Sequence, residues 1–129
     1  STPAVRGVGG QPIRGVSVTA YTSRPEETDS TPFETASGTL VRHGIVACNW
    51  LPFGTRLTIP ELFPGREFVV EDRMSSNYEK HPRNRTGLDV WMHDTAVARQ
   101  LGARTARVIL LNAVVVRNGR GEKEVVLRR

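Results

Sequence analysis

The sequence contains a single cysteine, Cys48, among its 129 residues. One thiol excludes an internal disulfide and a zinc site built from several cysteines. It does not report the redox state of the compartment, because disulfides are common in oxidising compartments but not required there. Cys48 ends the apolar segment 45–48, so we expect it to be a buried small hydrophobic residue rather than a nucleophile.

The sequence also lacks an apolar stretch long enough to cross a bilayer, which needs about 20 residues. It has neither a phosphate-binding glycine loop nor a nucleophile elbow. The three histidines, His43, His81 and His93, have no i, i+4 spacing to another ligand. We therefore expect no metal and no cofactor. The chain starts at Ser1, so we expect a processed form that could have lost an upstream signal peptide or lipid anchor.

Charge is biased toward the basic side: 18 Lys and Arg against 13 Asp and Glu give a net charge of +5. Such an excess suggests an acidic partner, although it is equally compatible with an ordinary soluble surface. The densest basic segments, 83–85 and 117–129, are not interleaved with aromatic residues. This argues against a nucleic-acid-binding module, and no nucleic-acid partner is expected.

The distribution of apolar and turn-forming residues predicts one β-rich domain. Residues 1–14 are rich in Gly, Pro and Val without a period and are interpreted as a flexible N-terminal arm, which leaves residues 15–129 as a single domain. The polar segment 22–34 predicts a loop. Many short strands with tight turns favour a closed barrel or a sandwich. The expected strands are 16–21, 38–41, 44–48, 56–59, 67–71, 88–92 and 106–111, with a hairpin at Asn118–Gly119 between 114–116 and 125–127.

One helix is expected, over residues 95–101. Asp94 is a good N-cap, and Gly102 fits the left-handed position that ends a helix. Val97 and Leu101 are four residues apart, so we expect both to face the core.

Two aspartates are the candidates for chemistry. Asp72 follows the expected strand 67–71 and opens a polar loop, whereas Asp89 lies inside the apolar strand 88–92. Burying a charge is costly, so such a carboxylate is normally paired, hydrogen-bonded or shifted to a raised pKa. It could serve as a general acid or simply pair with an arginine. The candidate arginine partners are Arg73, Arg83 and Arg85.

Several polar and aromatic residues could line a groove for sugars. The hydroxyl-bearing candidates are Thr19, Tyr21, Thr35 and Ser37. They could hydrogen-bond sugar hydroxyls, or they could be ordinary exposed strand and turn residues. Trp50 and Trp91 could stack on sugar rings, but aromatic residues more often belong to a core, which we favour for Trp91.

Taken in order, several segments resemble the three-aspartate (3D) domain family over about residues 16–111. The matching segments are 18–22, 29–32, 35–38, 51–57, 70–72, 88–91, 98–102 and 108–110. The resemblance implies a mainly β fold, a six-stranded double-psi β-barrel with one or two short helices. This is the barrel of membrane-bound lytic transglycosylase A and related cell-wall proteins.

The resemblance also implies roles for individual residues. It makes Asp89 the catalytic acid/base, with Asp72 supporting it and Thr19 in the same groove. Asn49 stands where the family has its first aspartate, and the interval of 17 positions from Asp72 to Asp89 is longer than expected. The candidate substrate-binding residues are Thr19, Tyr21, Thr35, Ser37 and Asn49.

The function implied is a peptidoglycan lytic transglycosylase. It would cleave the β-1,4 bond between N-acetylmuramic acid and N-acetylglucosamine and form 1,6-anhydromuramic acid. The expected partners are peptidoglycan glycan strands, the expected location is the bacterial periplasm, cell envelope or exterior, and a monomer is expected. Two alternatives stay open: an inverting glycoside hydrolase using Asp72 and Asp89, and a non-catalytic peptidoglycan-binding module.

Overall fold

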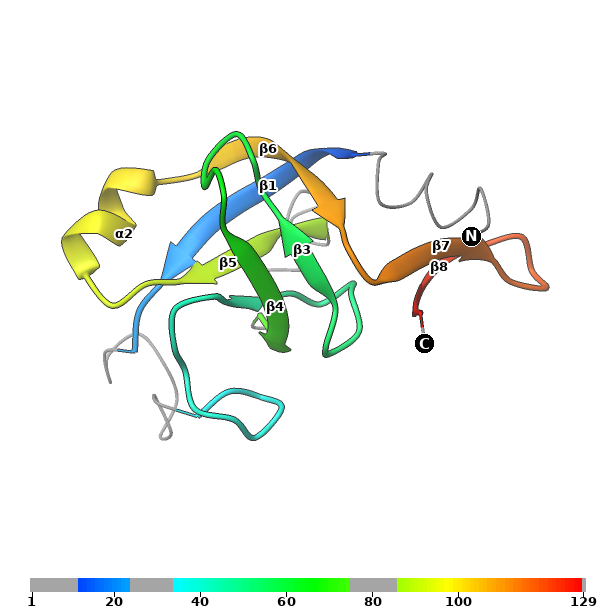
Figure 1. Cartoon of the computed structure of the whole chain (residues 1–129), viewed down its shortest axis with the longest axis horizontal. Coiled ribbons are helices and arrows are strands. Elements are labelled where there is room, and N and C mark those ends of the chain that lie inside the picture. The colour runs from blue at the N-terminus through cyan, green and yellow to red at the C-terminus, as the bar shows by residue number, and fades with distance from the viewer. Residues whose placement is uncertain (1–11, 24–33, 75–85, 129) are drawn as a thin grey trace.

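The chain folds into a closed β-barrel with a short helix and a separate hairpin (Figure 1). This computed structural model describes residues 12–23, 34–74 and 86–128. The elements are β1 (Ile13–Tyr21), β2 (Ile45–Ala47), β3 (Arg56–Thr58), β4 (Glu67–Asp72), β5 (Leu88–Trp91), α2 (Thr95–Leu101), β6 (Arg104–Leu110), β7 (Ala113–Arg117) and β8 (Lys123–Leu127).

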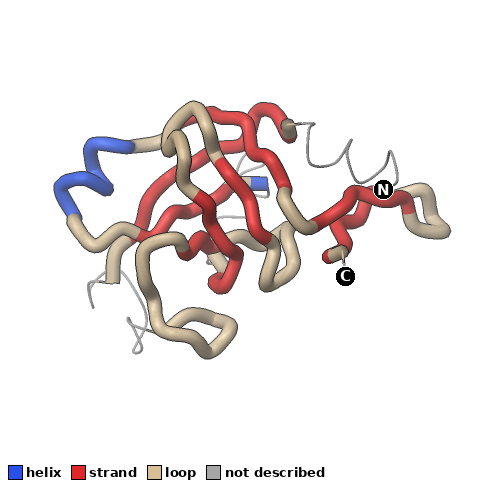
Figure 2. The backbone as a smooth tube through the Cα atoms, in the orientation of Figure 1, coloured by secondary structure: helices blue, strands red, loops and turns tan. Residues whose placement is uncertain are grey.

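Six strands close the barrel in the order β1-β5-β2-β4-β3-β6, and β7 and β8 form a separate two-stranded sheet. The pairs β1–β5 and β2–β4 are parallel, and the other barrel pairs are antiparallel. Figure 2 shows the strands wrapping around a common interior, with α2 at one end. The prediction of a mainly β fold with a closed six-stranded barrel is confirmed, and the strand pairing is compatible with a double-psi barrel.

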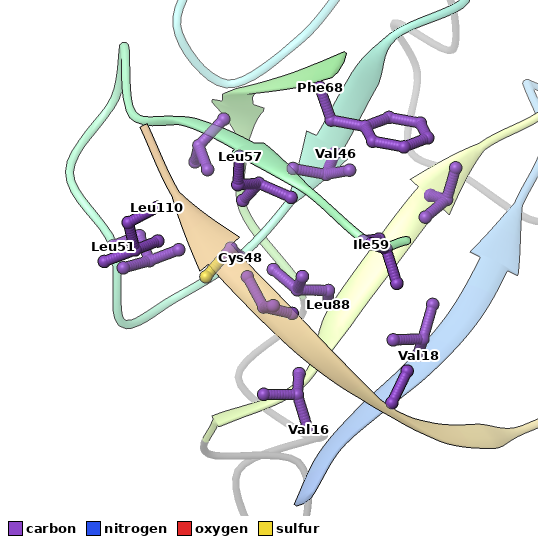
Figure 3. Packing of buried hydrophobic residues seen from close by; sticks show 14 of the residues in the cluster. Val16, Val18, Val46, Cys48, Leu51, Leu57, Ile59, Phe68, Leu88 and Leu110 are labelled. Atoms are coloured by element: carbon purple, nitrogen blue, oxygen red, sulfur yellow. The ribbon is translucent and has the colours of Figure 1, made fainter. Parts of the chain in front are cut away.

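The barrel interior is filled by the alternate apolar residues of its strands. In β1, Val16 and Val18 are buried, and in β5, Leu88 and Val90 are buried. A strand presents alternate residues to opposite faces, so these residues point inward from each strand. In Figure 3, side chains from several strands, including Val18, Leu57 and Leu88, converge on the interior. Each fully buried aliphatic side chain contributes about 1.5–3 kcal/mol of transfer free energy.

Cys48 belongs to this core, as predicted. Its side chain is fully buried and packs among the apolar residues (Figure 3). Burial raises the pKa of the Cys48 thiol to about 11, which keeps it protonated at neutral pH. A protonated, inaccessible thiol is a structural group and not a nucleophile.

The helix α2 has the predicted bounds and the predicted caps. The Asp94 carboxylate accepts hydrogen bonds from the backbone N–H groups of Ala96 and Val97, at 2.8 and 3.3 Å. Gly102 ends the helix with a φ of 61°, which only glycine adopts without strain. Leu101 packs against the core, but Val97 is 49% exposed, so the expectation that both face the core is wrong for Val97. None of the seven residues of α2 is fully buried.

Two other boundaries differ from the sequence prediction. Residues 38–41 form no strand; Glu34 and Leu40 make an isolated bridge around a turn in which Gly38 has a φ of 91°. β1 begins at Ile13, so the last residues of the expected arm belong to the barrel. The remainder of that arm, residues 1–11, lies outside the described residues, as does 24–33 of the expected loop.

The predicted C-terminal hairpin is present. Val115 and Val125 face each other in the register of β7 and β8. The turn is closed by the backbone N–H of Asn118, which donates to the Glu122 carbonyl at 2.9 Å. Ala113 is buried and Val125 packs against the barrel core, so the base of the hairpin is anchored to the barrel. Figure 1 shows the hairpin at the end of the barrel opposite α2.

We predict that Leu57→Ala lowers the free energy of unfolding by about 2–5 kcal/mol, because it removes a fully buried side chain from the barrel interior. Leu40→Ala is the matched control: Leu40 is 71% exposed, and the change should cost less than about 0.5 kcal/mol. Urea denaturation followed by circular dichroism measures both values. Equal costs for the two variants would contradict the placement of the core.

Candidate functional site

Four strands place Thr19, Asp89, Ala47 and Asp72 in one row across the sheet. Thr19 pairs with Asp89, Asp89 pairs with Ala47, and Ala47 pairs with Asp72. Within β5, the neighbours of Asp89 belong to the core, so its side chain points to the outer face of the barrel. The row therefore lies outside the core, on the face of the barrel that carries the candidate polar residues.

An irregularity in β4 brings Asp72 onto the same face as Asp89. Val46 pairs with Val70, but the next residue of β2, Ala47, pairs with Asp72, so the register shifts by one residue at Glu71. Simple alternation would have turned Asp72 inward, because Phe68 and Val70 are core residues. An extra residue in one strand reverses the facing of the residues after it. The bulge thus points Asp72 outward instead of into the apolar interior.

Asp89 is nearly enclosed. It is 8% exposed, and Thr19 Oγ1 donates a hydrogen bond of 3.0 Å to its Oδ1 atom. Burial raises the pKa of Asp89 to about 7; the nearby Asp72 carboxylate also raises it, while the Thr19 hydrogen bond acts in the opposite direction. The carboxyl group is therefore divided between its protonated and ionised forms near neutral pH, as a group that both donates and accepts a proton requires.

The alternative that Asp89 pairs with an arginine finds no support among the described residues. Arg73 instead donates to the backbone carbonyls of Cys48 and Leu51, at 2.6 and 2.9 Å. Its guanidinium also lies 3.8 Å from the centre of the Phe53 ring. Arg83 and Arg85, the other arginines considered, lie outside the described residues.

Asp72 has a different environment from Asp89. Its carboxylate accepts three hydrogen bonds, from the Tyr21 hydroxyl at 2.8 Å, the Ala36 N–H at 2.8 Å and the Arg73 N–H at 2.9 Å. Tyr21 follows Thr19 by two residues on the same face of β1, so its hydroxyl reaches from the Asp89 side of the row to Asp72. Burial, together with the Asp72 carboxylate, raises the pKa of Tyr21 above its ordinary value, so the phenol stays protonated and donates.

A pocket of about 510 Å³ opens beside Asp89. One wall comes from β1 and β5 and the other from α2. The lining residues are Thr19, Ala20, Tyr21, Thr22, Asp89, Thr95, Ala98, Arg99 and Gly102. Asp72 is not one of them. The pocket thus places one acid beside four hydroxyl-bearing residues, the arginine Arg99 and three small residues. Hydroxyl and guanidinium groups of this kind suit a ligand rich in oxygen atoms.

The structure brings Thr19 and Tyr21 together with Asp89, but it places the other candidate substrate-binding residues elsewhere. Thr35 is buried, and its hydroxyl is hydrogen-bonded to Ser37 at 3.0 Å and to Thr39 at 2.7 Å. The same turn supplies the Ala36 N–H to Asp72. The Asn49 side chain accepts a hydrogen bond of 2.8 Å from the Met74 backbone. In the described structure these polar groups hold loops together and lie outside the lining of the Asp89 pocket.

The two tryptophans contribute to packing. Trp91 is buried, in agreement with the prediction, and its indole N–H donates to the Ser23 hydroxyl at 2.7 Å. Trp50 packs against the core, and its N–H donates to the Gly87 carbonyl at 3.2 Å. Neither ring lines the pocket beside Asp89.

Sequence reasoning missed the contribution of α2 to the pocket. Thr95, Ala98 and Arg99 lie on the side of the helix that faces Asp89. The N-cap at Asp94 did locate the helix in the sequence, directly after the strand that carries Asp89. A sequence search for polar residues on that short helix could have found Thr95 and Arg99.

Comparison with known proteins adds no family assignment: no protein-family model matches the chain, and no curated protein matches its sequence. Within residues 12–23, 34–74 and 86–128, no helix is long and apolar enough to span a membrane. Across those same ranges, no three His, Cys, Asp or Glu side chains are grouped as a metal site would require.

We predict that Asp89→Asn changes stability in a pH-dependent way. The folded pKa of Asp89 is about 7, above its ordinary value, so its contribution to stability is present below about pH 4 and is lost as pH rises through 7. Asparagine keeps the acceptor for Thr19 and cannot ionise. The variant should therefore resemble the wild type at pH 4 and exceed its stability at pH 8 by up to about 4 kcal/mol.

Thermal unfolding at a series of pH values measures this difference. Asp94→Asn is the matched control, because it makes the same chemical change at an exposed N-cap where asparagine serves equally well. Its difference from the wild type, measured over the same pH series, is the baseline for comparison. A stability difference for Asp89→Asn that is constant from pH 4 to pH 8 would show that Asp89 is not the buried titrating group.

Proposed function

We propose that this chain is a lytic transglycosylase of peptidoglycan with a double-psi barrel of the 3D type, and that Asp89 is its general acid and base. One observation carries the proposal: an aspartate with a pKa of about 7 lies in a pocket that also contains four hydroxyl-bearing residues, with a threonine as its hydrogen-bond donor. An acid with this pKa can protonate a glycosidic oxygen near neutral pH and then act as a base.

In the first step, protonated Asp89 donates its proton to the oxygen that links N-acetylmuramic acid to N-acetylglucosamine. The bond between that oxygen and C1 of the muramyl sugar breaks, and the N-acetylglucosamine end leaves as an alcohol. Positive charge develops at C1 and on the ring oxygen. The Asp89 carboxylate formed in this step then stabilises that charge.

In the second step, the Asp89 carboxylate accepts the proton of the muramyl C6 hydroxyl. Oxygen 6 then bonds to C1 and closes the 1,6-anhydro ring. Asp89 is protonated again, so the cycle consumes no water and returns the enzyme to its starting state. The nucleophile belongs to the sugar whose bond was cut, which replaces an intermolecular attack by an intramolecular one.

The contrast between the two aspartates favours this reaction over hydrolysis. An inverting hydrolase needs a second carboxylate that activates water at the reacting carbon. Asp72 is held by three hydrogen-bond donors and is not part of the pocket lining. Its position suits a supporting role: it raises the pKa of Asp89 and fixes Tyr21.

The site also favours a catalytic role over a binding module. A binding surface gains nothing from a buried carboxyl group, whose ionisation costs stability at neutral pH. The barrel nevertheless holds the buried Asp89 carboxyl group at the wall of a pocket, where it accepts a hydrogen bond from the Thr19 hydroxyl. This arrangement is typical of a site whose protonation state is used.

We expect wild-type protein incubated with purified sacculi to release muropeptides that end in 1,6-anhydromuramic acid. Mass spectrometry identifies them, because they are one water lighter than the products of hydrolysis. Asp89→Asn should reduce their release by at least about 10³-fold, since an amide cannot transfer the proton. Asp94→Asn should release them at the wild-type rate.

Any result other than the release of 1,6-anhydromuropeptides argues against the proposal. Products that retain the added water would indicate a hydrolase, and retention on sacculi without any release would indicate a binding module. Undiminished release by Asp89→Asn would remove Asp89 from the mechanism.

The pH profile of the reaction should fall on its alkaline side with a midpoint near 7, because the first step requires protonated Asp89. Thr19→Val should move that midpoint upward, since the Thr19 hydrogen bond lowers the pKa of Asp89 and valine cannot donate. Thr19→Ser, which keeps the hydroxyl, should restore the wild-type midpoint. Initial rates between pH 5 and pH 9 measure the shift, and identical profiles for all three proteins would contradict the role of Thr19.

A further inference from the structure

The Asp89 pocket contains a cation that the reaction does not use. Arg99, on α2, is the only Lys or Arg among the described residues that line this pocket. Asp89 itself is hydrogen-bonded to Thr19, not to Arg99. The pocket therefore has an acid on the β5 wall and a separate positive charge on the helix wall.

Arg99 also has no structural partner within the described part of the chain. The exposed arginines Arg42, Arg56 and Arg107 each pair with a glutamate. Within residues 12–23, 34–74 and 86–128, no such pair or hydrogen bond involves the Arg99 side chain. The C-terminal end of α2, which an arginine in the last turn could stabilise, receives its hydrogen bond from Arg104, whose Nε donates to the Leu101 carbonyl at 3.0 Å. The guanidinium of Arg99 is thus left available at the pocket.

We infer that this pocket selects a glycan that carries a carboxylate, and that Arg99 is the residue that binds it. The inference rests on the proposed function and specifies its substrate: the sugar placed beside Asp89 bears an anionic substituent. A guanidinium suits this role because it is planar, always charged and able to bind both oxygens of a carboxylate at once.

The charges around the pocket support an anionic ligand. When Asp89 is protonated, Arg99 carries the only formal charge among the described lining residues. The neighbouring Asp72 lies outside the lining, and its carboxylate is already bound by three donors. The form of the site that can donate a proton is therefore also the form that attracts an anion.

Binding measurements test the inference without requiring catalysis. In an Asp89→Asn background, isothermal titration compares two probes at pH 7: a peptide-free tetrasaccharide of alternating N-acetylglucosamine and N-acetylmuramic acid, and neutral chitotetraose. The first carries lactyl carboxylates and the second carries none. We expect the anionic probe to bind at least about tenfold more tightly, with a preference that weakens as salt is added.

Adding Arg99→Ala should lower the affinity for the anionic probe about tenfold, to the level of chitotetraose, and leave chitotetraose binding unchanged. Arg120→Ala is the matched control, because Arg120 lies in the β7–β8 turn at the far end of the molecule (Figure 1). A third probe, the tetrasaccharide bearing peptide stems, locates the carboxylate. If Arg99 increases the affinity only for this third probe, the carboxylate that it binds belongs to the peptide. If Arg99 already increases the affinity for the peptide-free tetrasaccharide, the carboxylate belongs to the lactyl group.

The outcomes separate this inference from the proposed function. If wild-type protein releases anhydromuropeptides but Arg99→Ala has an unchanged KM and unchanged affinities, the reaction stands and the role of Arg99 is wrong. If no release occurs but the anionic probes bind in an Arg99-dependent manner, the reaction is wrong and the carboxylate site stands. The inference is overturned if none of the probes binds. It is also overturned if the peptide-free and the peptide-bearing muramyl tetrasaccharides each bind with the same affinity whether or not Arg99 is present.

Discussion

The burial of one carboxyl group on strand β5 is the constraint on which the proposed chemistry of this molecule depends. β5 lies between β1 and β2, and all four of its residues are buried. Leu88 and Val90 fill the core, so the geometry of a strand sends Asp89 to the outer face. There the pocket walls formed by β1 and α2 leave it 8% exposed. The barrel thus fixes the position of the acid and removes most of the water that would otherwise keep its pKa near 4.

The same row of residues gives the two aspartates different properties. Asp72 accepts three hydrogen bonds, whereas within the described ranges the Asp89 side chain accepts its hydrogen bond from Thr19. Donors stabilise a charged carboxylate, and dehydration destabilises it. Two acids in one neighbourhood can therefore take different parts, with Asp89 the proposed proton donor and Asp72 an acceptor that holds Tyr21 and the backbone around it. Tyr21 connects them, because its hydroxyl binds Asp72 while its side chain lines the pocket of Asp89.

Local rules of sequence were sufficient for the strand that carries the acid. Alternation within each strand places Val18, Leu88 and Val90 in the core and turns Thr19 and Asp89 to the outer face. That Thr19 and Asp89 lie in one groove was expected only from the resemblance to the 3D family. The caps of α2 were equally visible, because Asp94 and Gly102 act within one turn of the helix. These features depend on interactions between residues close in the chain or on strand periodicity.

Features set by the tertiary structure could not be obtained in this way. The facing of Asp72 depends on a bulge at Glu71, and a register shift of one residue leaves no clear mark in the sequence. Thr35 was a candidate for binding sugars, and the sequence does not show that its hydroxyl is hydrogen-bonded within its own turn, to Ser37 and Thr39. The exposure of Val97 and the position of Arg99 at the pocket both depend on how a two-turn helix lies against the barrel. Hydrophobic spacing alone therefore placed Val97 in the core incorrectly.

The location of the acid on a strand, rather than on a loop, has a consequence for how the site works. A strand hydrogen-bonded on both sides holds its side chains in nearly fixed directions, so Asp89 and Thr19 keep their geometry without a ligand. The free energy lost by enclosing an ionisable group is offset by the apolar interior that the neighbouring residues of the same strand build. The residues that build the core and the residue proposed to transfer the proton therefore alternate along the same strand, β5. By contrast, the α2 wall with Thr95 and Arg99 belongs to a helix without a fully buried residue, where substitutions can change what the pocket binds without disturbing the acid or the core.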